Sequence, residues 1–517
     1  MTPSPAGSLR AAPFRLPAMI AILAVLAGWA PGAARAADLL VTSADDTVNG
    51  DTSSPDALAA QPGPDGVSLR EAILAADNVP GPHRIELSSS LSAQPLVLAS
   101  DLPPITRDGI SLVGPTGRAR EPLVTISGSP ISVFASHFRA SGLRLTAARG
   151  AVFFVFAGTT GFPGSRAIED VRIEDDVFDG TDAPELGHGV SIGTPEGSEG
   201  ASIRGVRISG NTFLRFRGDV AAVICEVGGT GGVIRDLAVA GNTFVENSVA
   251  VRVGIEGSHA RLSAVALSGN AFLDNGIAVA AISGALPGHP PSTDGVVEGI
   301  RIEGNRIRGG ESAAIYFLAG GAGATGLAIR DVDIVNDALW GGSGFAIGGQ
   351  AGSGAGSIGN RIEGIRVTND TVVLGGGRSG LSFSANAYGA QGNSVSGIEA
   401  LNSIFRGTGN DFGGDVPPDS VSHCIVSDPK DAGADGNLVA DPSFVDPDAG
   451  DFRLKPGSPA IGKGDAAGAP CGDIEGRARF ADGRVDIGAY EFGAPYPPRP
   501  CPIVPAAGGE AALSRSR

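Results

Sequence analysis

The stretch VRISGNTFL at residues 206–214 decides the fold, because close variants of it return along the chain. LAVAGNTFV follows at 237–245, VALSGNAFL at 265–273 and IRIEGNRIR at 300–308. Within each copy, apolar residues alternate with polar ones, which is typical of a β-strand and not of a helix. A repeat at this spacing indicates a solenoid, a propeller or another array of stacked units.

The spacing of the copies selects one of these architectures. An apolar anchor closes each copy, and the anchors follow one another at intervals of 28 to 35 residues: Phe178, Phe213, Phe244, Phe272, Ile307, Leu339, Val372 and Phe405. A propeller blade needs four strands in about 40–45 residues, whereas each unit here contains two clear strands and room for a third. We therefore predict an all-β fold, a parallel β-helix with about 32 residues per coil, in which equivalent strands pair between coils. Phe213, Phe244 and Phe272 should then stack in one interior column.

A polar column accompanies the repeat, because Asn or Asp stands just after a strand in seven units. Its members are Asp176, Asn211, Asn242, Asn270, Asn305, Asp337 and Asp370. Both residue types tolerate the left-handed conformation and hydrogen-bond to nearby backbone in turns. Stacked coils would align these side chains as a turn ladder, and we favour this interpretation over a stripe that binds a ligand.

The first 36 residues have the features of a secretory signal peptide. Arg10 and Arg15 precede an apolar run at 18–30, and Ala34-Arg35-Ala36 forms a small-residue cleavage site. The apolar run is too short to span a bilayer, so we expect a secreted or cell-surface protein without a transmembrane segment in the mature chain. The formal net charge is −17, and removal of three arginines leaves −20. Such a charge disfavours nucleic acid as a partner, and we expect a monomer.

Near the N-terminus, GVSLREAILAADN at 66–78 and LPPITRDGISLVGP at 102–115 resemble the CSLREA-type module of exported β-helix proteins. Val67 stands in place of the Cys that names this module. Leu69, Ile73 and Leu74 have helical spacing. We expect a short amphipathic helix here that caps the first coil, because an open end of a solenoid invites edge pairing.

Near the C-terminus, DPSFVDPDAGDFRLKPGSPAIGKGD at 441–465 and DIEGRARFADGRVDIGAYEF at 473–492 resemble the choice-of-anchor Q domain. The resemblance implies a right-handed, pectate-lyase-like β-helix on an exported or surface protein, and no single reaction. We expect this module to cap the last coil rather than to form a free domain.

These features predict five segments in chain order. They are a signal peptide (1–36), a CSLREA-like cap with the first coils (37–128), the parallel β-helix (129–436), a choice-of-anchor Q-like module (437–492) and a Pro-rich tail (493–517). Four cysteines allow three connectivities if two disulfides form. Cys471 and Cys501 flank the C-terminal module and are the preferred pair, whereas Cys225 fits a buried free thiol within an apolar strand.

One segment suggests catalysis. GHGVSIG at 187–193 resembles the Gly-His-Gly segment of polygalacturonase-type β-helix hydrolases, with His188 as its histidine. Asp175 and Asp176 lie upstream and would supply the two carboxylates that a glycosidase needs, and Arg252 would bind a uronate carboxylate. The Asn-Thr-Asp and Arg-Ile-Lys segments of that family are absent, so His188 also fits a surface histidine on a Gly-rich strand edge.

No metal motif stands out, and we expect no cofactor. Loop acids Asp179, Asp182 and Glu185 could supply calcium ligands for a lyase, but their segment also fits an ordinary solvated turn. Two functions remain open. The favoured one is a binding or structural surface protein that contacts an extracellular polysaccharide or a surface partner without catalysis, and the alternative is a carbohydrate-active hydrolase or lyase.

Overall fold

The computed structural model describes residues 37–493 apart from 147–150, 159–166, 182–186, 219, 285–289, 376–378, 408, 433–434 and 481–482. The expected signal peptide and the Pro-rich tail beyond Gly493 lie outside the described residues, as do Asp182, Glu185 and Cys501.

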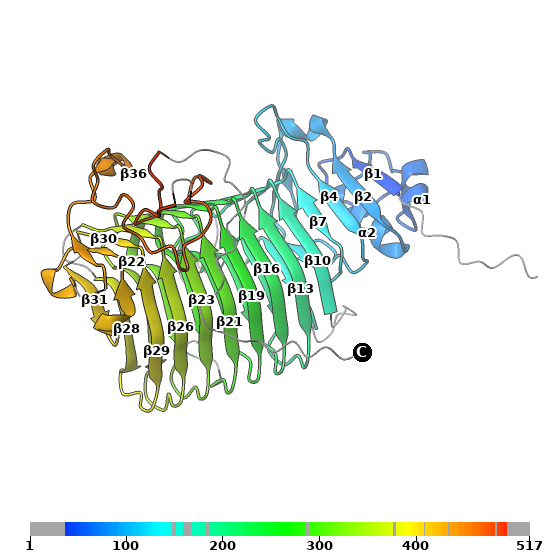
Figure 1. The fold of residues 1–517 in the computed structure, drawn as a ribbon. Helices are drawn as coiled ribbons and strands as arrows, with labels where there is room; N and C mark the ends of the chain where they lie inside the picture. Colours follow the sequence, from blue (N-terminus) through cyan, green and yellow to red (C-terminus); the bar gives the residue numbers. More distant parts are fainter. Residues whose placement is uncertain are drawn as a thin grey trace, which may run out of the picture. The chain divides into compact units, whose positions relative to one another are not determined.

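The chain forms a parallel β-helix, as the repeat predicts, and its coils are right-handed. One wall of the helix is a 13-stranded parallel sheet, here called sheet A, and its neighbouring strands come from successive coils (Figure 1). Its strands are β1 (Ala37–Val41), β2 (His83–Leu87), β4 (Ile110–Val113), β7 (Arg139–Ser141), β10 (Ala167–Glu174), β13 (Ser202–Ser209), β16 (Val233–Ala240), β19 (Arg261–Ser268), β21 (Val296–Glu303), β23 (Ala328–Val335), β26 (Arg361–Thr368), β29 (Ser394–Leu401) and β32 (Val421–Ser422).

The other walls belong to a 21-stranded sheet that divides into two columns. The short-strand column follows the predicted turn ladder and contains β3 (Leu96–Val97), β5 (Thr125–Ser127), β8 (Arg144–Thr146), β11 (Val177–Asp179), β14 (Thr212–Leu214), β17 (Thr243–Val245), the first halves of β20 (Ala271–Ser283) and β22 (Arg306–Ala319), β24 (Ala338–Trp340), β27 (Thr371–Val373), β30 (Ile404–Arg406), β33 (Ile425–Val426) and β34 (Leu438–Val439). The long-strand column contains β6 (Ile131–Val133), β9 (Phe153–Phe156), β12 (Val190–Thr194), β15 (Ala221–Val227), β18 (Val249–Ile255), the second halves of β20 and β22, β25 (Phe345–Ser353), β28 (Ser379–Ala387) and β31 (Asn410–Gly414).

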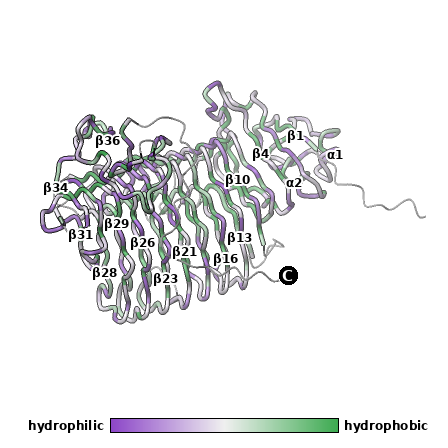
Figure 2. The backbone as a smooth tube through the Cα atoms, viewed as in Figure 1, coloured by the Kyte–Doolittle hydropathy of each residue, from purple (hydrophilic) through white to green (hydrophobic). Residues whose placement is uncertain are grey.

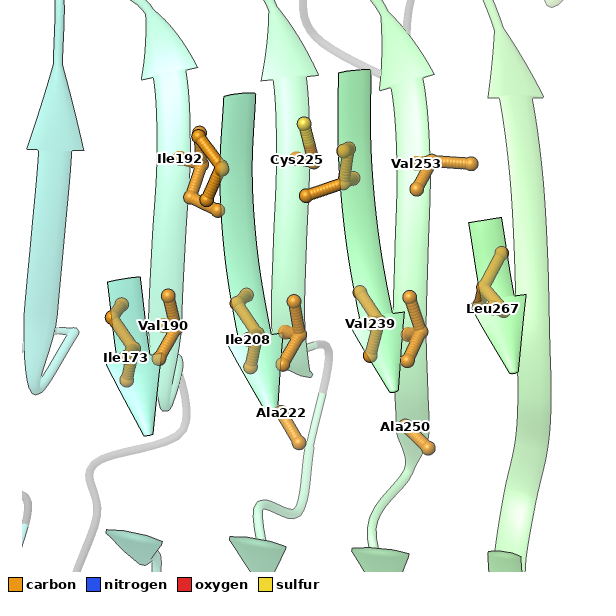
Figure 3. Close-up of a cluster of buried hydrophobic side chains, with 14 of the residues drawn as sticks. Ile173, Val190, Ile192, Ile208, Ala222, Cys225, Val239, Ala250, Val253 and Leu267 are labelled. Carbon is orange, nitrogen blue, oxygen red and sulfur yellow. The ribbon is translucent and has the colours of Figure 1, made fainter. Parts of the chain in front are cut away.

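The core fills the inside of the coils with columns of apolar side chains. Alternation along each strand sends every second residue inward, so apolar and polar segments follow each other along the backbone (Figure 2). Equivalent residues of successive coils then stack, as Ile192, Cys225 and Val253 do across β12, β15 and β18 (Figure 3).

The predicted aromatic column is confirmed. Phe213, Phe244 and Phe272 are fully buried, and their rings stack with centroids 4.9 and 5.0 Å apart. Phe178 extends the stack by one coil, 4.7 Å from Phe213. The eight predicted anchors pair in register from coil to coil.

The N-terminal end carries two helices, α1 (Pro55–Ala60) and α2 (Leu69–Asn78). Helix α2 lies on the segment predicted to be helical and packs against β1 and β2. Ser68 and Glu71 form a capping box at its start, which satisfies two backbone N–H groups that the helix itself cannot bond. Within the described part of the chain, no helix is long and apolar enough to cross a bilayer.

The C-terminal module packs along the outward side of the short-strand column, whereas the sequence predicted a cap on the last coil. Asn336, Asn369 and Asn402, from three successive coils, donate side-chain hydrogen bonds to its backbone. Its hairpin of β35 (Phe444–Asp446) and β36 (Asp451–Leu454) places Phe444 and Phe452 in one apolar cluster with Ala338 and Ile404. Four 3-10 turns complete the described elements: η1 (Ser89–Ala93), η2 (Pro418–Ser420), η3 (Pro429–Asp431) and η4 (Pro447–Ala449).

Candidate functional site

The outward face of the long-strand column brings together a charged cluster that interrupts an otherwise apolar or small-residue surface. Strand pairing places Phe156, Gly193, Glu226 and Gly254 in one row across four coils. The row beside it contains Phe154, Ser191, Ile224 and Arg252.

Glycines on both sides of Glu226 keep the floor of this surface flat. A Cβ atom added at Gly193 would lie 2.9 Å from a ring carbon of Phe156, and one added at Gly254 would lie 2.3 Å from the carbonyl oxygen of Ile282. Neither position has space for a larger residue without displacement of its neighbours. The ring of Phe156 therefore lies over Gly193, on the same side as Glu226.

Arg252 is held beside Glu226 and is largely buried. Its Nη2 atom lies 3.3 Å from Oε2 of Glu226, and the two side chains are 14% and 22% exposed. The Nε atom of Arg252 is buried and has no hydrogen-bond partner among the described residues. A buried donor without a partner is costly, so this guanidinium has unused capacity to bind a ligand.

Glu256 follows β18 and completes the cluster. Burial raises the pKa of the Glu256 carboxyl to about 8, and the charge of Glu226 and a hydrogen bond with it act in the same direction, while Arg252 opposes them. Glu256 therefore keeps its proton at neutral pH. The result is a hydrogen-bonded pair of a carboxyl and a carboxylate beside an arginine, which can donate and accept hydrogen bonds at one point.

The cluster borders a cavity, and aromatic side chains lie along the same face. Glu256 and Glu196 line a cavity of about 250 Å³ together with Thr230 and Pro291. On one side of the cluster the rings of Phe154 and Phe156 are 5.4 Å apart. On the other side, two coils from Arg252 in the same row, the ring of Tyr316 lies 6.1 Å from that of Phe345.

The structure places only one of the four predicted catalytic residues, Arg252, in this cluster. Asp175 is exposed in the turn between β10 and β11, and Asp176 is buried in the same turn. Oδ1 of Asp176 accepts a hydrogen bond from the backbone of Leu143 at 2.7 Å. Burial raises the pKa of this carboxyl well above its usual range.

His188 lies at the opposite end of the strand from Glu226. It precedes β12, and its Nδ1 is 3.1 Å from the backbone nitrogen of Ala221. Gly193, the neighbour of Glu226, is five residues further along, which is about 16 Å in an extended strand. The structure thus does not bring His188 together with Arg252 and the carboxylates.

The seven residues expected to form the turn ladder lie in one buried column, and the backbone N–H of Asp176 donates to Oδ1 of Asn211 at 2.9 Å. The backbone N–H of each rung donates to the side chain of the rung in the next coil, from Asn211 through Asn242, Asn270, Asn305 and Asp337 to Asp370. Two shorter ladders, Asn247 with Asn275 and Asn360 with Asn393, were not expected from the sequence.

The structure describes only some of the cysteines and calcium-ligand candidates that the sequence suggested. Cys225 and Cys424 are buried free thiols, whereas Cys471 is disulfide-bonded and Cys501 lies outside the described residues. Asp179, a candidate calcium ligand, pairs with Arg215 at 3.0 Å. The described residues contain no group of three or more His, Cys, Asp or Glu side chains arranged for a metal ion.

Sequence reasoning missed Glu226 and Glu256, although a signal was present. AAVICEV at 221–227 and VAVRVGI at 249–255 each carry one charged residue in an apolar strand. Lys, Glu, Arg and Asp are seldom buried without a partner. Two such residues in neighbouring coils would have indicated a charge pair.

Comparison with known proteins gives structural neighbours and no family. No family model and no curated protein matches this chain. Solved structures similar to it include a Geobacillus virus E2 ORF18 protein, at 12% identity over 73% of this chain and 61% of that chain with a TM-score of 0.28. The A-module of the Azotobacter vinelandii mannuronan C-5 epimerase AlgE6 is 14% identical over 67% of this chain and 91% of that chain, with a TM-score of 0.31.

A third similar structure is the pectate lyase Pel9A, at 13% identity over 89% of this chain and 97% of that chain with a TM-score of 0.33. This chain spans 61% of the length of the viral protein. Similarities at this level do not extend to activity, and the β-helix assignment rests on the strand pairing described above.

Proposed function

We propose that this protein binds an extracellular polysaccharide along the outward face of its long-strand column, at Glu226, Arg252 and Glu256. The observation that carries the proposal is the flat, glycine-lined row from Phe156 to Gly254 with a charged pair at its centre. Aromatic rings provide an apolar surface for the C–H faces of sugars, and a few well-placed polar groups fix orientation in ligand sites.

The charges at this site favour a neutral glycan. Glu226 and Glu196 outnumber the single cation Arg252, since Glu256 keeps its proton, and the whole chain has a net charge of −17. Like charges repel, so a polyuronate would meet repulsion here, whereas the hydroxyl groups of a neutral sugar can donate to the carboxylate of Glu226 and accept from Arg252.

The proposal includes an exported location and a surface role. It is supported by the signal-peptide pattern at 1–36 and by the resemblance of the two ends of the chain to the CSLREA-type module and the choice-of-anchor Q domain. We propose that the β-helix acts as a monomeric, rigid support for the binding face.

Binding to an array of neutral and acidic glycans tests this proposal. The variants E226Q and F156A should weaken binding to the best neutral ligand about tenfold, because each removes a contact worth about 1.5 kcal/mol. The exposed Glu399 on sheet A provides a matched control, and E399Q should leave the affinity within a factor of two. Equal effects of E226Q and E399Q, or no binding to any neutral glycan, would contradict the proposal.

The protonated state of Glu256 favours one alternative, a carbohydrate-active enzyme. A carboxyl that keeps its proton near neutral pH can act as a general acid, and the pKa of Glu256 is raised to about 8. Release of reducing ends or unsaturated uronates from the bound glycan would reveal such an activity. E256Q should then abolish turnover while binding persists, and the rate should fall as pH rises through about 8.

A further inference from the structure

We propose that the outer face of sheet A contains a second ligand site, a groove that binds a carboxylated (uronate-containing) polysaccharide. The groove has a volume of about 600 Å³ and is formed by the first halves of strands β10, β13, β16 and β19, which lie side by side (Figure 1). It lies on a different wall of the β-helix from Glu226, so the two sites are independent.

A bend in every strand of this part of sheet A defines the groove. The fourth residue of β10, β13, β16 and β19 has a positive φ, at Asp170, Gly205, Asp236 and Ala264. The pairing register skips this residue in each pair of coils. Apart from Ser136, the residues that line the groove precede the bend and come from equivalent three-residue segments of the four strands.

Three arginines from three successive coils line the groove. Arg204 and Arg235 are neighbours in one row, and Arg261 stands in the next coil two residues earlier in its strand. Adjacent strands are about 4.8 Å apart. The guanidinium groups are thus spread along the axis of the helix, which suits a polymer with repeated acidic groups better than a single small anion.

Two of the three groove arginines form ion pairs with carboxylates of the protein, and the third can bind a ligand. Arg204 pairs with Asp236 at 3.0 Å, but both side chains are about half exposed, and Arg261 pairs with Glu298. Exposed ion pairs are weak and exchange readily with other anions. Arg235 is exposed, and the described residues offer it no carboxylate within ion-pairing distance.

The rest of the lining selects among anions. Carboxylates limit the arginine row at both ends, since Glu169 precedes Arg204 and Glu298 follows Ser263. A DNA duplex carries a charge about every 1.7 Å, too dense for so few cations next to these acids. Ser136, Ser202 and Ser263 also line the groove, and their hydroxyls can bond sugar hydroxyls between the carboxylates. Arginine pairs with a planar carboxylate through two parallel hydrogen bonds.

Charge reversal at Arg235 tests this site in the full-length protein. The exposed Arg207, three residues beyond Arg204 in β13 and outside the groove, supplies a matched control with the same change of charge. Binding would be measured by calorimetry against polygalacturonate, polymannuronate and carboxyl-reduced polygalacturonate at low salt. R235E should weaken binding of at least one polyuronate about tenfold. R235K should weaken it about threefold, because an ammonium group cannot form the two parallel hydrogen bonds of a guanidinium with a carboxylate. R207E should weaken it less than twofold.

Several outcomes of this experiment would contradict the proposed site. If neither polyuronate binds, if the carboxyl-reduced polymer binds as well as the acid, or if R207E matches R235E, the groove does not recognise carboxylates. Binding of a 20-bp DNA duplex with the same sensitivity to R235E would overturn the ligand class. E226Q should leave polyuronate binding unchanged, so failure here and failure of the neutral-glycan site are distinguishable.

Discussion

The turn ladder is built with amides in one stretch and with carboxyl groups in another, although the backbone is the same in both. In the amide stretch, Oδ1 of Asn242 accepts from the backbone of Asn211, and its Nδ2 donates to the carbonyl of Ile208 at 2.9 Å. Asn270 and Asn305 repeat this pattern. Every polar atom of such a rung has a partner.

The carboxyl rungs satisfy only half of the same pattern. Oδ1 of Asp337 accepts from Asn305 and Oδ1 of Asp370 accepts from Asp337, but Oδ2 of each is buried without a partner among the described residues. Burial raises the pKa of Asp337 to about 7 and that of Asp370 well above its usual range. An ionised carboxylate cannot donate, so the fold favours the protonated acid, which imitates an amide.

The comparison extends to the core, where the largest effect is expected. The amide rungs Asn211, Asn242 and Asn270 precede stacked phenylalanines, whereas Leu339 and Val372 follow the carboxyl rungs Asp337 and Asp370. Phe244→Ala should lower the free energy of unfolding by about 3–5 kcal/mol, and Leu339→Ala should lie toward the low end of about 2–5 kcal/mol. Urea denaturation measures both, and Thr243→Ala, an outward neighbour, should change stability by less than about 0.5 kcal/mol.

Conversion of an amide rung to a carboxyl rung should lower the stability of the fold, because it leaves a buried carboxyl oxygen without a hydrogen-bond donor. Asn242→Asp places an acid opposite the carbonyl of Ile208 and next to Oδ1 of Asn270. We expect a loss of about 1–3 kcal/mol at pH 8, and a smaller loss at pH 4, where the new carboxyl is protonated and can donate. A loss that does not change with pH would show that shape, not charge, determines the rung.

The reverse substitution should stabilise the protein. Asp337→Asn would supply a donor for the carbonyl of Ile302, the equivalent of the acceptors at the amide rungs. Because the folded pKa of Asp337 is about 7, above the ordinary value near 4, the wild type loses stability as pH rises from about 4 to 7. The variant lacks this loss. Its gain should be near zero at pH 4 and about 1–2 kcal/mol at pH 8.

Asp428→Asn offers a control for this gain. Asp428 is partly exposed to solvent and pairs with Lys430, and hydrogen bonds lower the pKa of its carboxyl. A lowered folded pKa contributes stability above pH 4, so this substitution should not stabilise at pH 8. If both variants gain equally, the effect comes from reduced net charge and not from the rung.

These rungs also show how far the sequence leads. The anchors and the ladder could be predicted because the same residue types recur in every coil, and recurrence identifies the register. Glu226 was missed because its row contains Phe156, Gly193 and Gly254, which share no pattern. The pKa of Glu256 depends on burial against a turn of another coil, and periodicity contains no information on that contact.

The position of the C-terminal module was beyond prediction for a similar reason. Its apolar residues indicated packing on the coils, but the contact site depends on bonds such as that from Arg479 to Asn336, at 2.6 Å across 143 residues. Arg479 is fully buried, pairs with Glu491 at 3.1 Å and lies near enough to Asp370 to oppose the rise of its pKa. Asp337 and Asp370 thus lie where the module adds a cation near the ladder, whereas Asp176, the carboxyl rung of the first coil of the ladder, has no such cation among the causes of its pKa shift.

The smallest expected effect is the coupling between the adjacent carboxyl rungs Asp337 and Asp370. This coupling would separate the effect of burial from that of charge repulsion on their stability. Burial is the first cause of the raised pKa of Asp370, and the charge of Asp337 is the second. If repulsion contributes, the gains of Asp337→Asn and Asp370→Asn are not additive, because either substitution relieves the other acid. A double-mutant cycle at pH 8 should give a coupling of about 0.5–1 kcal/mol. At pH 4 both acids are protonated in the folded state, so the coupling should vanish. Additive gains at pH 8 would mean that each carboxyl is penalised by its own burial alone, and the difference between the amide and carboxyl stretches would then be a sum of independent rungs.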